Sequence, residues 1–298
     1  MHFTKMQGIG NDYVYVNGFA EKVRDPERTA VRVSDRHFGI GGDGLIIIAP
    51  SEKADCAMQM YNADGSAGKM CGNGIRCVAK YVCDHGMVSG NDLTVETLSG
   101  VKKIHVEKGP DGKVVTATVD MGAPVLRPSE IPVLFRRSGS AEKIPLVFDG
   151  PAEGPLTGGL LTLSDGTETR VTCVSMGNPH CVIFTDTPVE ELKLTETGPM
   201  YEHAAAFPER INTEFVNVLS RTHVRMRVWE RGSGETLACG TGACAVTAAA
   251  VLAEKTERRI TVSLPGGDLA VHWDETSGHI LMTGPAVTVF EGEINDEN

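Results

Sequence analysis

The chain has 298 residues, of which 41% are hydrophobic and 22% charged, and these proportions are typical of a soluble globular protein large enough for two domains. Its formal net charge of −11 argues against a nucleic-acid partner. Because no apolar run approaches the roughly 20 residues of a membrane span and the first residues lack a signal-peptide pattern, we expect a cytoplasmic protein that does not contact a membrane.

The first half of the chain is predicted to consist mainly of strands. In chain order we expect strands at Phe3–Met6 and Tyr13–Asn17, a short helix from Asp25 to about Arg36, strands at Leu45–Ala49 and Cys56–Tyr61, a helix from about Asn73 to His85, and strands at Leu93–Thr97, Lys102–Glu107 and Val114–Asp120. The next segment, 123–165, is rich in proline and glycine, and we interpret it as the crossing into the second half.

The second half repeats this order. We expect strands at Thr169–Val174, His180–Phe184, Thr213–Leu219 and His223–Arg231, a helix at Thr241–Lys255, and a final strand at Ala286–Glu293. The helix is apolar on nearly every face, which is typical of a helix that is buried on all sides. Each half is therefore predicted to be a curved sheet around a central helix, with the last strand, in 286–298, a candidate to return to the first half.

An internal repeat supports this division. Met70–Cys77 reads Met-Cys-Gly-Asn-Gly-Ile-Arg-Cys and Ala238–Ala245 reads Ala-Cys-Gly-Thr-Gly-Ala-Cys-Ala, and their first cysteines lie 168 residues apart. The same offset pairs Tyr61 with Trp229, Asn62 with Glu230 and Gly44 with Asn212, and an offset of 167 pairs Asn11 with Asn178 and Leu93 with Ile260. Such agreement indicates duplication. The predicted fold is α+β, with two pseudo-symmetric halves (1–122, joined by about 286–298, and 123–285), each a mainly antiparallel sheet, and an active site in the cleft between them.

The repeated cysteines carry the chemical signal. Cys71 and Cys239 each stand just before a Gly-x-Gly turn that opens a helix. A helix N-terminus has unpaired N–H groups and a partial positive charge, so it binds anions and lowers the pKa of a cysteine. Two such thiols on opposite faces of one carbon could remove and return a proton. We expect the eight cysteines to be reduced, because the chain is large, rich in core residues and without a secretion pattern, and we expect no metal site, because no Cys-x-x-Cys pair occurs.

Three stretches, Met70–Gly74, Met176–His180 and Glu230–Ala245, closely resemble motifs of the diaminopimelate epimerase family. The resemblance extends over essentially the whole chain. It implies a cofactor-independent isomerase that interconverts LL- and meso-2,6-diaminopimelate on the route to lysine and the peptidoglycan cross-link. It further implies a homodimer, with diaminopimelate as the small-molecule partner and no cofactor.

The resemblance also assigns roles to residues. It implies that Cys71 and Cys239 are the catalytic acid–base pair and that His180 supports them. The residues it implies for substrate binding are Asn11, Asn62, Asn178, Asn212, Glu230 and Arg231 through their side chains, and Gly72, Asn73, Gly240 and Thr241 through backbone N–H groups. A departure occurs at Gly44, where many family members carry a glutamine, so a side-chain contact to the substrate amino group is missing here.

Two alternatives stay open. Proline racemases and hydroxyproline epimerases use a similar pair of cysteines in glycine turns. They lack residues that bind the distal end of an acyclic amino acid, the role expected here for Asn178, Asn212 and Arg231. From another class, the chain could be an amino-acid-binding or redox-sensing protein whose thiols form a disulfide. Proton exchange at the substrate Cα separates these hypotheses.

Overall fold

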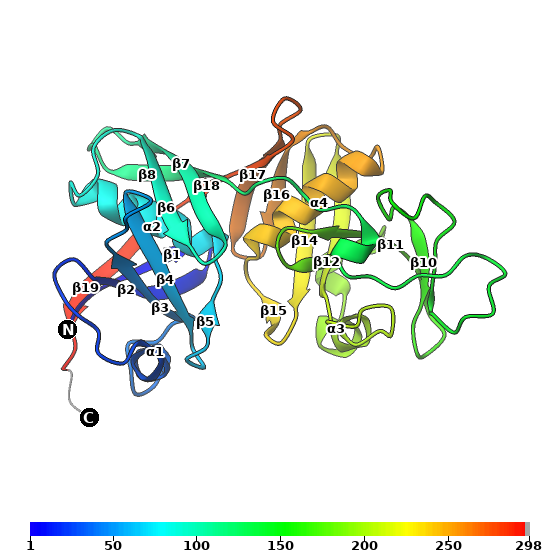
Figure 1. Cartoon of the computed structure of the whole chain (residues 1–298), viewed down its shortest axis with the longest axis horizontal. Helices are drawn as coiled ribbons and strands as arrows, with labels where there is room; N and C mark the ends of the chain where they lie inside the picture. The colour runs from blue at the N-terminus through cyan, green and yellow to red at the C-terminus, as the bar shows by residue number, and fades with distance from the viewer. Residues whose placement is uncertain (296–298) are drawn as a thin grey trace. The chain divides into compact units, whose positions relative to one another are not determined.

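The computed structural model describes residues 1–295, and within it the chain divides into two compact units. Unit 1 comprises Met1–Asp120 and Thr283–Asn298, and unit 2 comprises Met121–Met282. The chain therefore leaves unit 1 after Asp120 and returns to it at Thr283 (Figure 1). Residues 296–298 of the predicted final segment lie outside the described part of the chain.

Unit 1 is built mainly from strands. Its elements are β1 (His2–Gly8), β2 (Asn11–Asn17), α1 (Pro26–Ser34), β3 (Gly44–Ala49), β4 (Cys56–Asn62), β5 (Ala67–Gly68), α2 (Gly72–Asp84), β6 (Asp92–Thr97), β7 (Gly100–Lys108), β8 (Val114–Asp120) and β19 (Val287–Glu293). Helix α1 begins where the sequence predicts, because the Asp25 side chain accepts a hydrogen bond from the N–H of Arg28 and Pro26 fits the first turn.

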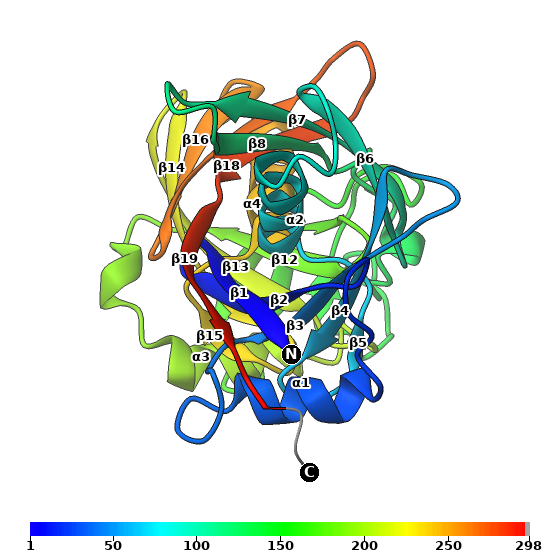
Figure 2. The same ribbon diagram turned by 90° about the vertical axis from the view of Figure 1, so that its left-hand side faces the viewer.

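Helix α2 lies at the centre of unit 1. Figure 2 shows it nearly end-on, with β7 and β8 on one side and β1 and β2 on the other. Almost all of its residues are buried, including Arg76, which is fully enclosed. A buried guanidinium needs acceptors for its N–H groups. Arg76 finds them in the carbonyls of Gly72 and Pro285 and the side chain of Asn73, so it ties the start of α2 to the strand segment that returns from unit 2.

Unit 2 contains its own set of elements. They are β9 (Leu146–Val147), β10 (Gly159–Thr162), β11 (Glu168–Ser175), β12 (Pro179–Phe184), α3 (Leu194–Glu202), β13 (Asn212–Ser220), β14 (His223–Glu230), β15 (Gly234–Thr236), α4 (Gly240–Leu252), β16 (Arg259–Leu264), β17 (Gly267–Trp273) and β18 (Ile280–Pro285), whose last residues belong to unit 1. Helix α4 packs against β11, β12, β13, β16 and β17 (Figure 1).

The two units share the same strand registers. In unit 1, β2 and β3 are parallel with Val14 opposite Leu45, and in unit 2, β12 and β13 are parallel with Cys181 opposite Thr213, as the sequence offsets require. The parallel pair β4–β6 recurs as β14–β16, and the antiparallel pair β6–β7 recurs as β16–β17. The predicted α+β fold, with a strongly wrapped sheet around a buried helix in each half, is confirmed.

The interpretation of 123–165 as a crossing is wrong for most of its length. This segment contains β9 and β10, and its residues Ile131, Leu146, Leu156 and Leu161 are buried in the core of unit 2. The apolar side chains there are spaced by turns and produce no periodic pattern, yet they pack in one buried cluster with residues of β11, β12 and β13. Helix α3, which follows β12, is also absent from the prediction, because Gly198 and Pro199 within it are typical of loops.

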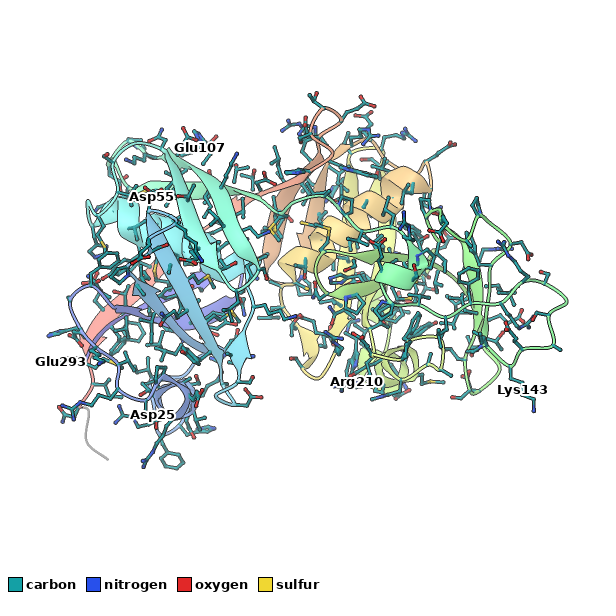
Figure 3. All side chains as sticks on the ribbon, in the orientation of Figure 1. Asp25, Asp55, Glu107, Lys143, Arg210 and Glu293 are labelled. Carbon is teal, nitrogen blue, oxygen red and sulfur yellow. The ribbon has the colours of Figure 1, made fainter. Side chains whose placement is uncertain are left out.

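Charged side chains mark the outside of each unit. Asp55 and Glu107 on unit 1 and Lys143 and Arg210 on unit 2 are exposed and point outward (Figure 3). Among the helices of residues 1–295, none combines the length and apolar character that crossing a membrane requires.

Candidate active site

Each of the two repeated cysteines caps a central helix. Cys71 is the N-cap of α2, and its Sγ accepts a hydrogen bond from the N–H of Gly74 at 3.3 Å. Cys239 is the N-cap of α4, and its Sγ accepts from the N–H of Gly242, also at 3.3 Å. Both residues have extended backbone angles, as N-caps require. Each sulfur is thus held beside the first-turn N–H groups of a buried helix, where negative charge is stabilised.

In unit 1, a series of hydrogen bonds connects Cys71 to Asn11 and Asp43. The Cys71 thiol lies 3.1 Å from Oδ1 of Asn11, and Nδ2 of Asn11 donates to the carboxylate of Asp43 at 2.6 Å. The backbone N–H of Asp12 also donates to Asp43. Burial raises the pKa of Asp43 above its ordinary value, and these donors offset part of that effect. Asp43 therefore fixes the orientation of the Asn11 amide, a role that the sequence did not reveal.

The other predicted residues of unit 1 lie around the same helix start. Gly72 and Asn73 occupy the first turn of α2, ahead of its first backbone hydrogen bond from Ile75 to Cys71. The side chain of Asn73 is buried and accepts a hydrogen bond from Arg76 at 2.9 Å, so the side chain has a structural role. Asn62 ends β4 and donates to the hydroxyl of Ser66 at 3.0 Å.

Gly44 starts β3 with a φ of +159°, and the space around it is closed. A Cβ at this position would lie 2.1 Å from the carbonyl oxygen of Tyr61 and 2.7 Å from the ring of Tyr13. No side chain fits here without a shift of backbone. The backbone around Gly44 thus leaves no room for the glutamine of other family members, so the difference involves the backbone as well as the side chain.

In unit 2, Cys239 is 5% exposed, and its sulfur has polar neighbours. It lies 3.5 Å from the hydroxyl of Thr241, which accepts a hydrogen bond from Nδ2 of Asn178 at 3.3 Å. Burial raises the pKa of the Cys239 thiol well above its ordinary value, the carboxylates of Glu230 and Glu214 raise it further, and the donors Thr241 and Gly242 offset only part of this. The expectation of a lowered pKa is wrong for Cys239, because desolvation outweighs the helix terminus, and this residue is a protonated thiol at neutral pH.

Glu230 and Arg231 follow one another at the end of β14. Glu230 accepts a hydrogen bond from the hydroxyl of Thr236 at 2.5 Å, and burial raises its pKa above the ordinary value. The backbone N–H of Arg231 donates to Oδ1 of Asn212 at 2.8 Å, and its guanidinium donates to the carbonyl of Glu209 at 2.8 Å. These contacts hold the guanidinium at the rim of unit 2.

Most of the predicted residues therefore cluster by unit. Unit 1 brings Asn11, Gly72 and Asn73 to Cys71, whereas unit 2 brings Asn178, Gly240 and Thr241 to Cys239. His180 contacts Asn178, with its Nε2 3.1 Å from Oδ1 of that asparagine. Glu214, which pairs with His180 at 2.6 Å, is not among the residues predicted from the sequence. A single charged residue inside the otherwise uncharged run Asn212–Val216 was the available signal.

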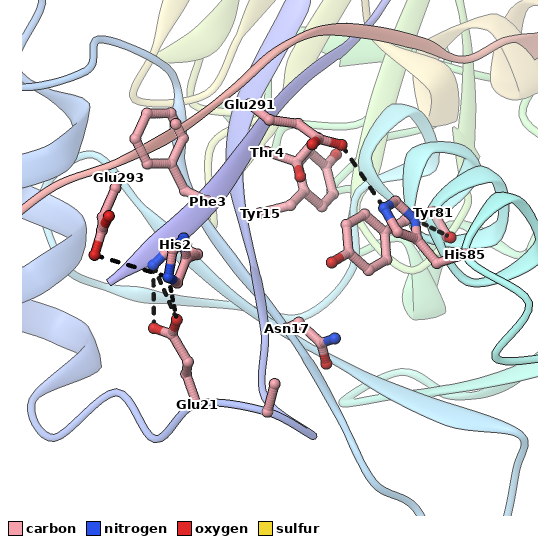
Figure 4. Close-up of a pocket in the computed structure, with 12 residues that line it drawn as sticks. His2, Phe3, Thr4, Tyr15, Asn17, Glu21, Tyr81, His85, Glu291 and Glu293 are labelled. Carbon is pink, nitrogen blue, oxygen red and sulfur yellow. Dashed lines mark hydrogen bonds and ion pairs between the residues drawn. The ribbon is translucent and has the colours of Figure 1, made fainter.

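A pocket of about 540 Å³ also opens on unit 1, and its lining includes neither thiol. Figure 4 shows its histidines and glutamates, which pair with one another. His2 lies 3.7 Å from Glu293, and His85 lies 3.7 Å from Glu291. Within residues 1–295, no group of three or more His, Cys, Asp or Glu side chains has the arrangement of a metal site.

Comparisons with known proteins identify the relatives of the chain. The family model described as diaminopimelate epimerase matches residues 3–127 and 172–289. A protein of Acetivibrio thermocellus named diaminopimelate epimerase is 53% identical over 300 residues, which cover 99% of both chains. A protein of Desulfovibrio desulfuricans with the same name is 54% identical over 293 residues, which cover 98% of both chains.

Solved structures with low sequence identity share the fold. A hydroxyproline epimerase from Agrobacterium vitis has a TM-score of 0.68 at 15% identity, and the match covers 99% of this chain and 90% of that one. A PhzF-family phenazine biosynthesis protein from Bacillus anthracis has a TM-score of 0.65 at 17% identity, with 99% of both chains covered. The fold thus occurs in proteins with different names.

Proposed function

This chain belongs to the diaminopimelate epimerase family, and we propose that it interconverts LL- and meso-2,6-diaminopimelate, for lysine and peptidoglycan precursor biosynthesis, by passing a proton between Cys71 and Cys239. The observation that carries the proposal is the pair of matching N-caps, in which each sulfur accepts the N–H of a glycine at 3.3 Å at the start of a buried helix.

The reaction explains why two such helix starts are needed. The Cα–H of an amino acid is a weak acid, and inversion requires a base on one face of the carbon and an acid on the other. Without a delocalising cofactor, the developing negative charge must be stabilised by oriented N–H groups. We assign this role to the first-turn N–H groups of Gly72, Asn73, Gly240 and Thr241, which would bind the carboxylate of the reacting centre.

The protonation of the two thiols sets their roles. Cys239 is a protonated thiol, because burial and two carboxylates raise its pKa. We therefore propose that Cys239 donates a proton in the resting protein and that Cys71 removes one after its thiol has given up the hydrogen bond to Oδ1 of Asn11. After one turnover the proton has moved to Cys71, so the reverse reaction returns the protein to its starting state.

The side chains around the thiols would hold the substrate. Glu230 has a raised pKa because of its burial, and a substrate ammonium beside it would stabilise the carboxylate form. Such a cation would also lessen the repulsion that Glu230 exerts on a Cys239 thiolate. Arg231 would bind the distal carboxylate, and Asn11, Asn62, Asn178 and Asn212 would bind the remaining amino and carboxylate groups.

A racemase of proline or hydroxyproline is the second candidate, since the Agrobacterium vitis protein shares the fold. A cyclic imino acid has no distal ammonium and carboxylate, so it would leave Glu230 and Arg231 without partners. The similarity to that protein lies under 25% identity and supports the fold alone, whereas the relatives named diaminopimelate epimerase are about half identical over the full chain.

A substrate panel tests the proposal. The purified protein is incubated with LL-, meso- and DD-diaminopimelate and with L- and D-proline, and the products are separated by chiral chromatography. We expect interconversion of the LL and meso isomers and no reaction of proline. Racemisation of proline would establish the second candidate, and no reaction with any compound would favour a binding or redox-sensing protein.

The finer predictions of the family resemblance are tested separately. We propose a homodimer, which size-exclusion chromatography with light scattering would detect as a particle of twice the chain mass. We also propose that no metal or pyridoxal phosphate is needed. Activity lost on dialysis against a chelator and restored by one metal would contradict that.

A further inference from the structure

A buried histidine–glutamate pair lies next to the second thiol site. Nδ1 of His180 is 2.6 Å from Oε1 of Glu214, and both side chains are fully buried. The second carboxylate oxygen of Glu214 is buried with no hydrogen-bond partner. Burying a carboxylate with one contact costs free energy that a packed apolar pair would not cost. Such a pair in the core therefore calls for an explanation outside stability.

The duplicated half shows that the fold does not need this pair. At the offsets of the repeat, His180 corresponds to Tyr13 and Glu214 to Ile46, both buried in unit 1. Ile46 packs against the start of α2, since a Cβ on Gly74 would lie 2.7 Å from its Cδ1. Glu214 takes the same place at the start of α4, where a Cβ on Gly242 would lie 2.8 Å from its Oε1. The scaffold thus accepts an apolar residue where unit 2 has a carboxylate.

The pair is connected to the thiol by hydrogen bonds. Nε2 of His180 is 3.1 Å from Oδ1 of Asn178, whose Nδ2 donates to the hydroxyl of Thr241 at 3.3 Å. That hydroxyl is 3.5 Å from the sulfur of Cys239. The chain Glu214–His180–Asn178–Thr241–Cys239 is continuous, with Glu214 at one end and Cys239 at the other. Unit 1 has a different arrangement, in which Asn11 contacts Cys71 directly and is held by Asp43.

We propose that Glu214 is a positioning residue, which acts through His180, Asn178 and Thr241 to direct a hydrogen-bond donor at the sulfur of Cys239 when that sulfur is a thiolate. The proposal rests on the proposed function in that Cys239 is taken as a group that gains and loses a proton.

The direction of the chain follows from the partners of the imidazole. Nδ1 faces a carboxylate oxygen and Nε2 faces an amide oxygen, so in the proposed arrangement both ring nitrogens donate. Asn178 then presents Nδ2 to Thr241, and the Thr241 hydroxyl is left to donate to sulfur. With a neutral imidazole, the side-chain amide of Asn178 would rotate so that its oxygen accepts a hydrogen bond from the Thr241 hydroxyl. The sulfur of Cys239 could then only donate to that hydroxyl, which would stabilise the thiol over the thiolate.

The charges around the sulfur decide the sign of the expected effect. Cys239 is faced by Glu230 from β14 and by Glu214 from β13, and Glu214 is itself faced by His180 and by the Cys181 thiol from β12. In Glu214→Gln, loss of the carboxylate removes a charge that raises the pKa of Cys239, and it also removes the acceptor that keeps both nitrogens of His180 donating, so that Thr241 no longer donates to the sulfur. The lost donor from Thr241 then dominates, and the thiolate of Cys239 becomes harder to form.

The test compares the thiol reactivity of Glu214→Gln with that of the unchanged protein. Iodoacetamide labelling is followed against pH, and mass spectrometry of peptides reports Cys239 and Cys71 separately. We expect the labelling midpoint of Cys239 to rise by about one pH unit, the effect of one hydrogen bond to a charged group, while that of Cys71 is unchanged. The same variant should lose about tenfold in kcat with little change in KM at pH 7.

Thr213→Val is the matched control. Thr213 precedes Glu214 on β13, is fully buried and also has an unpartnered oxygen, but it lies outside the chain to Cys239. The control should keep both midpoints and kcat. The proposal would be overturned if the labelling midpoint of Cys239 in Glu214→Gln equalled or fell below that of the unchanged protein. It would also be overturned if Thr213→Val showed the same shift. Failure of the protein to epimerise diaminopimelate would instead count against the proposed function, because labelling does not depend on turnover.

A double variant separates positioning from folding. His180→Tyr with Glu214→Ile installs the residues that unit 1 carries at the same positions, so the packing has a precedent in the chain itself. It should fold and should show the raised Cys239 midpoint. A folded double variant with an unchanged midpoint would also overturn the proposal.

Discussion

Replacing Cys71 or Cys239 by alanine is expected to abolish epimerisation while the protein remains folded. Each cysteine is the N-cap of its helix and not a residue within it, so replacement by the smaller alanine removes an acid or base and one weak cap. General acid–base catalysis contributes about 10²–10⁴-fold for each group. Replacement by serine should be nearly as harmful, because a hydroxyl is a far weaker acid than a thiol. The measurement is initial rate with LL-diaminopimelate, alongside thermal unfolding.

Other cysteines of the chain supply the controls. Burial raises the pKa of Cys56 to about 12 and that of Cys77 to about 11, so these thiols remain protonated and serve as packing groups. Cys244→Ala, within α4, and Cys83→Ala, within α2, should keep most of the activity. Either Cys71→Ala or Cys239→Ala with more than about a hundredth of the original rate would rule out the two-thiol mechanism.

Replacing Arg231 by lysine is expected to lower kcat/KM by about 10²-fold, mostly through a higher KM, because lysine cannot form a paired contact with a carboxylate. The guanidinium is held by the carbonyl of Glu209, and lysine would lose that support as well. Michaelis curves with LL-diaminopimelate measure the effect.

Arg225→Lys is the matched control for this prediction. Arg225 lies on the same strand, β14, and pairs with Glu190 at the surface, where such a pair contributes little to stability. Its replacement should leave kcat/KM unchanged. An Arg231→Lys variant with the KM of the unchanged protein would show that the distal carboxylate binds elsewhere.

The repeat explains why so much of the fold could be predicted. Duplication copies both the helix start and the strand register, so Cys71 and Cys239 could be placed at equivalent N-caps from the sequence offset alone. Segment 123–165 has no counterpart in the first half, and its buried residues, such as Leu146 and Leu156, follow no period. Its place in the core of unit 2 could be found only from tertiary packing.

The site was less predictable where its chemistry depends on burial. Asp43 and Glu214 stand in the sequence as an ordinary loop aspartate and a strand glutamate, and only the structure shows that they orient Asn11 and His180. The helix N-terminus alone likewise predicts a lowered pKa for Cys239, whereas the pKa is raised. Desolvation depends on the residues that surround the sulfur in space, and the local motif does not contain them.

The most direct test of the central claim is the fate of the Cα proton in D₂O. LL-diaminopimelate is converted to a small extent, and substrate and product are analysed for deuterium by mass spectrometry. With two thiols on opposite faces, the proton removed by Cys71 stays behind and a deuteron arrives from Cys239. The meso product should therefore carry one deuterium from its first appearance, and the recovered LL isomer should carry none. Meso product that first appears without deuterium, because it carries the proton just removed, would show that a single base serves both faces and would contradict the account.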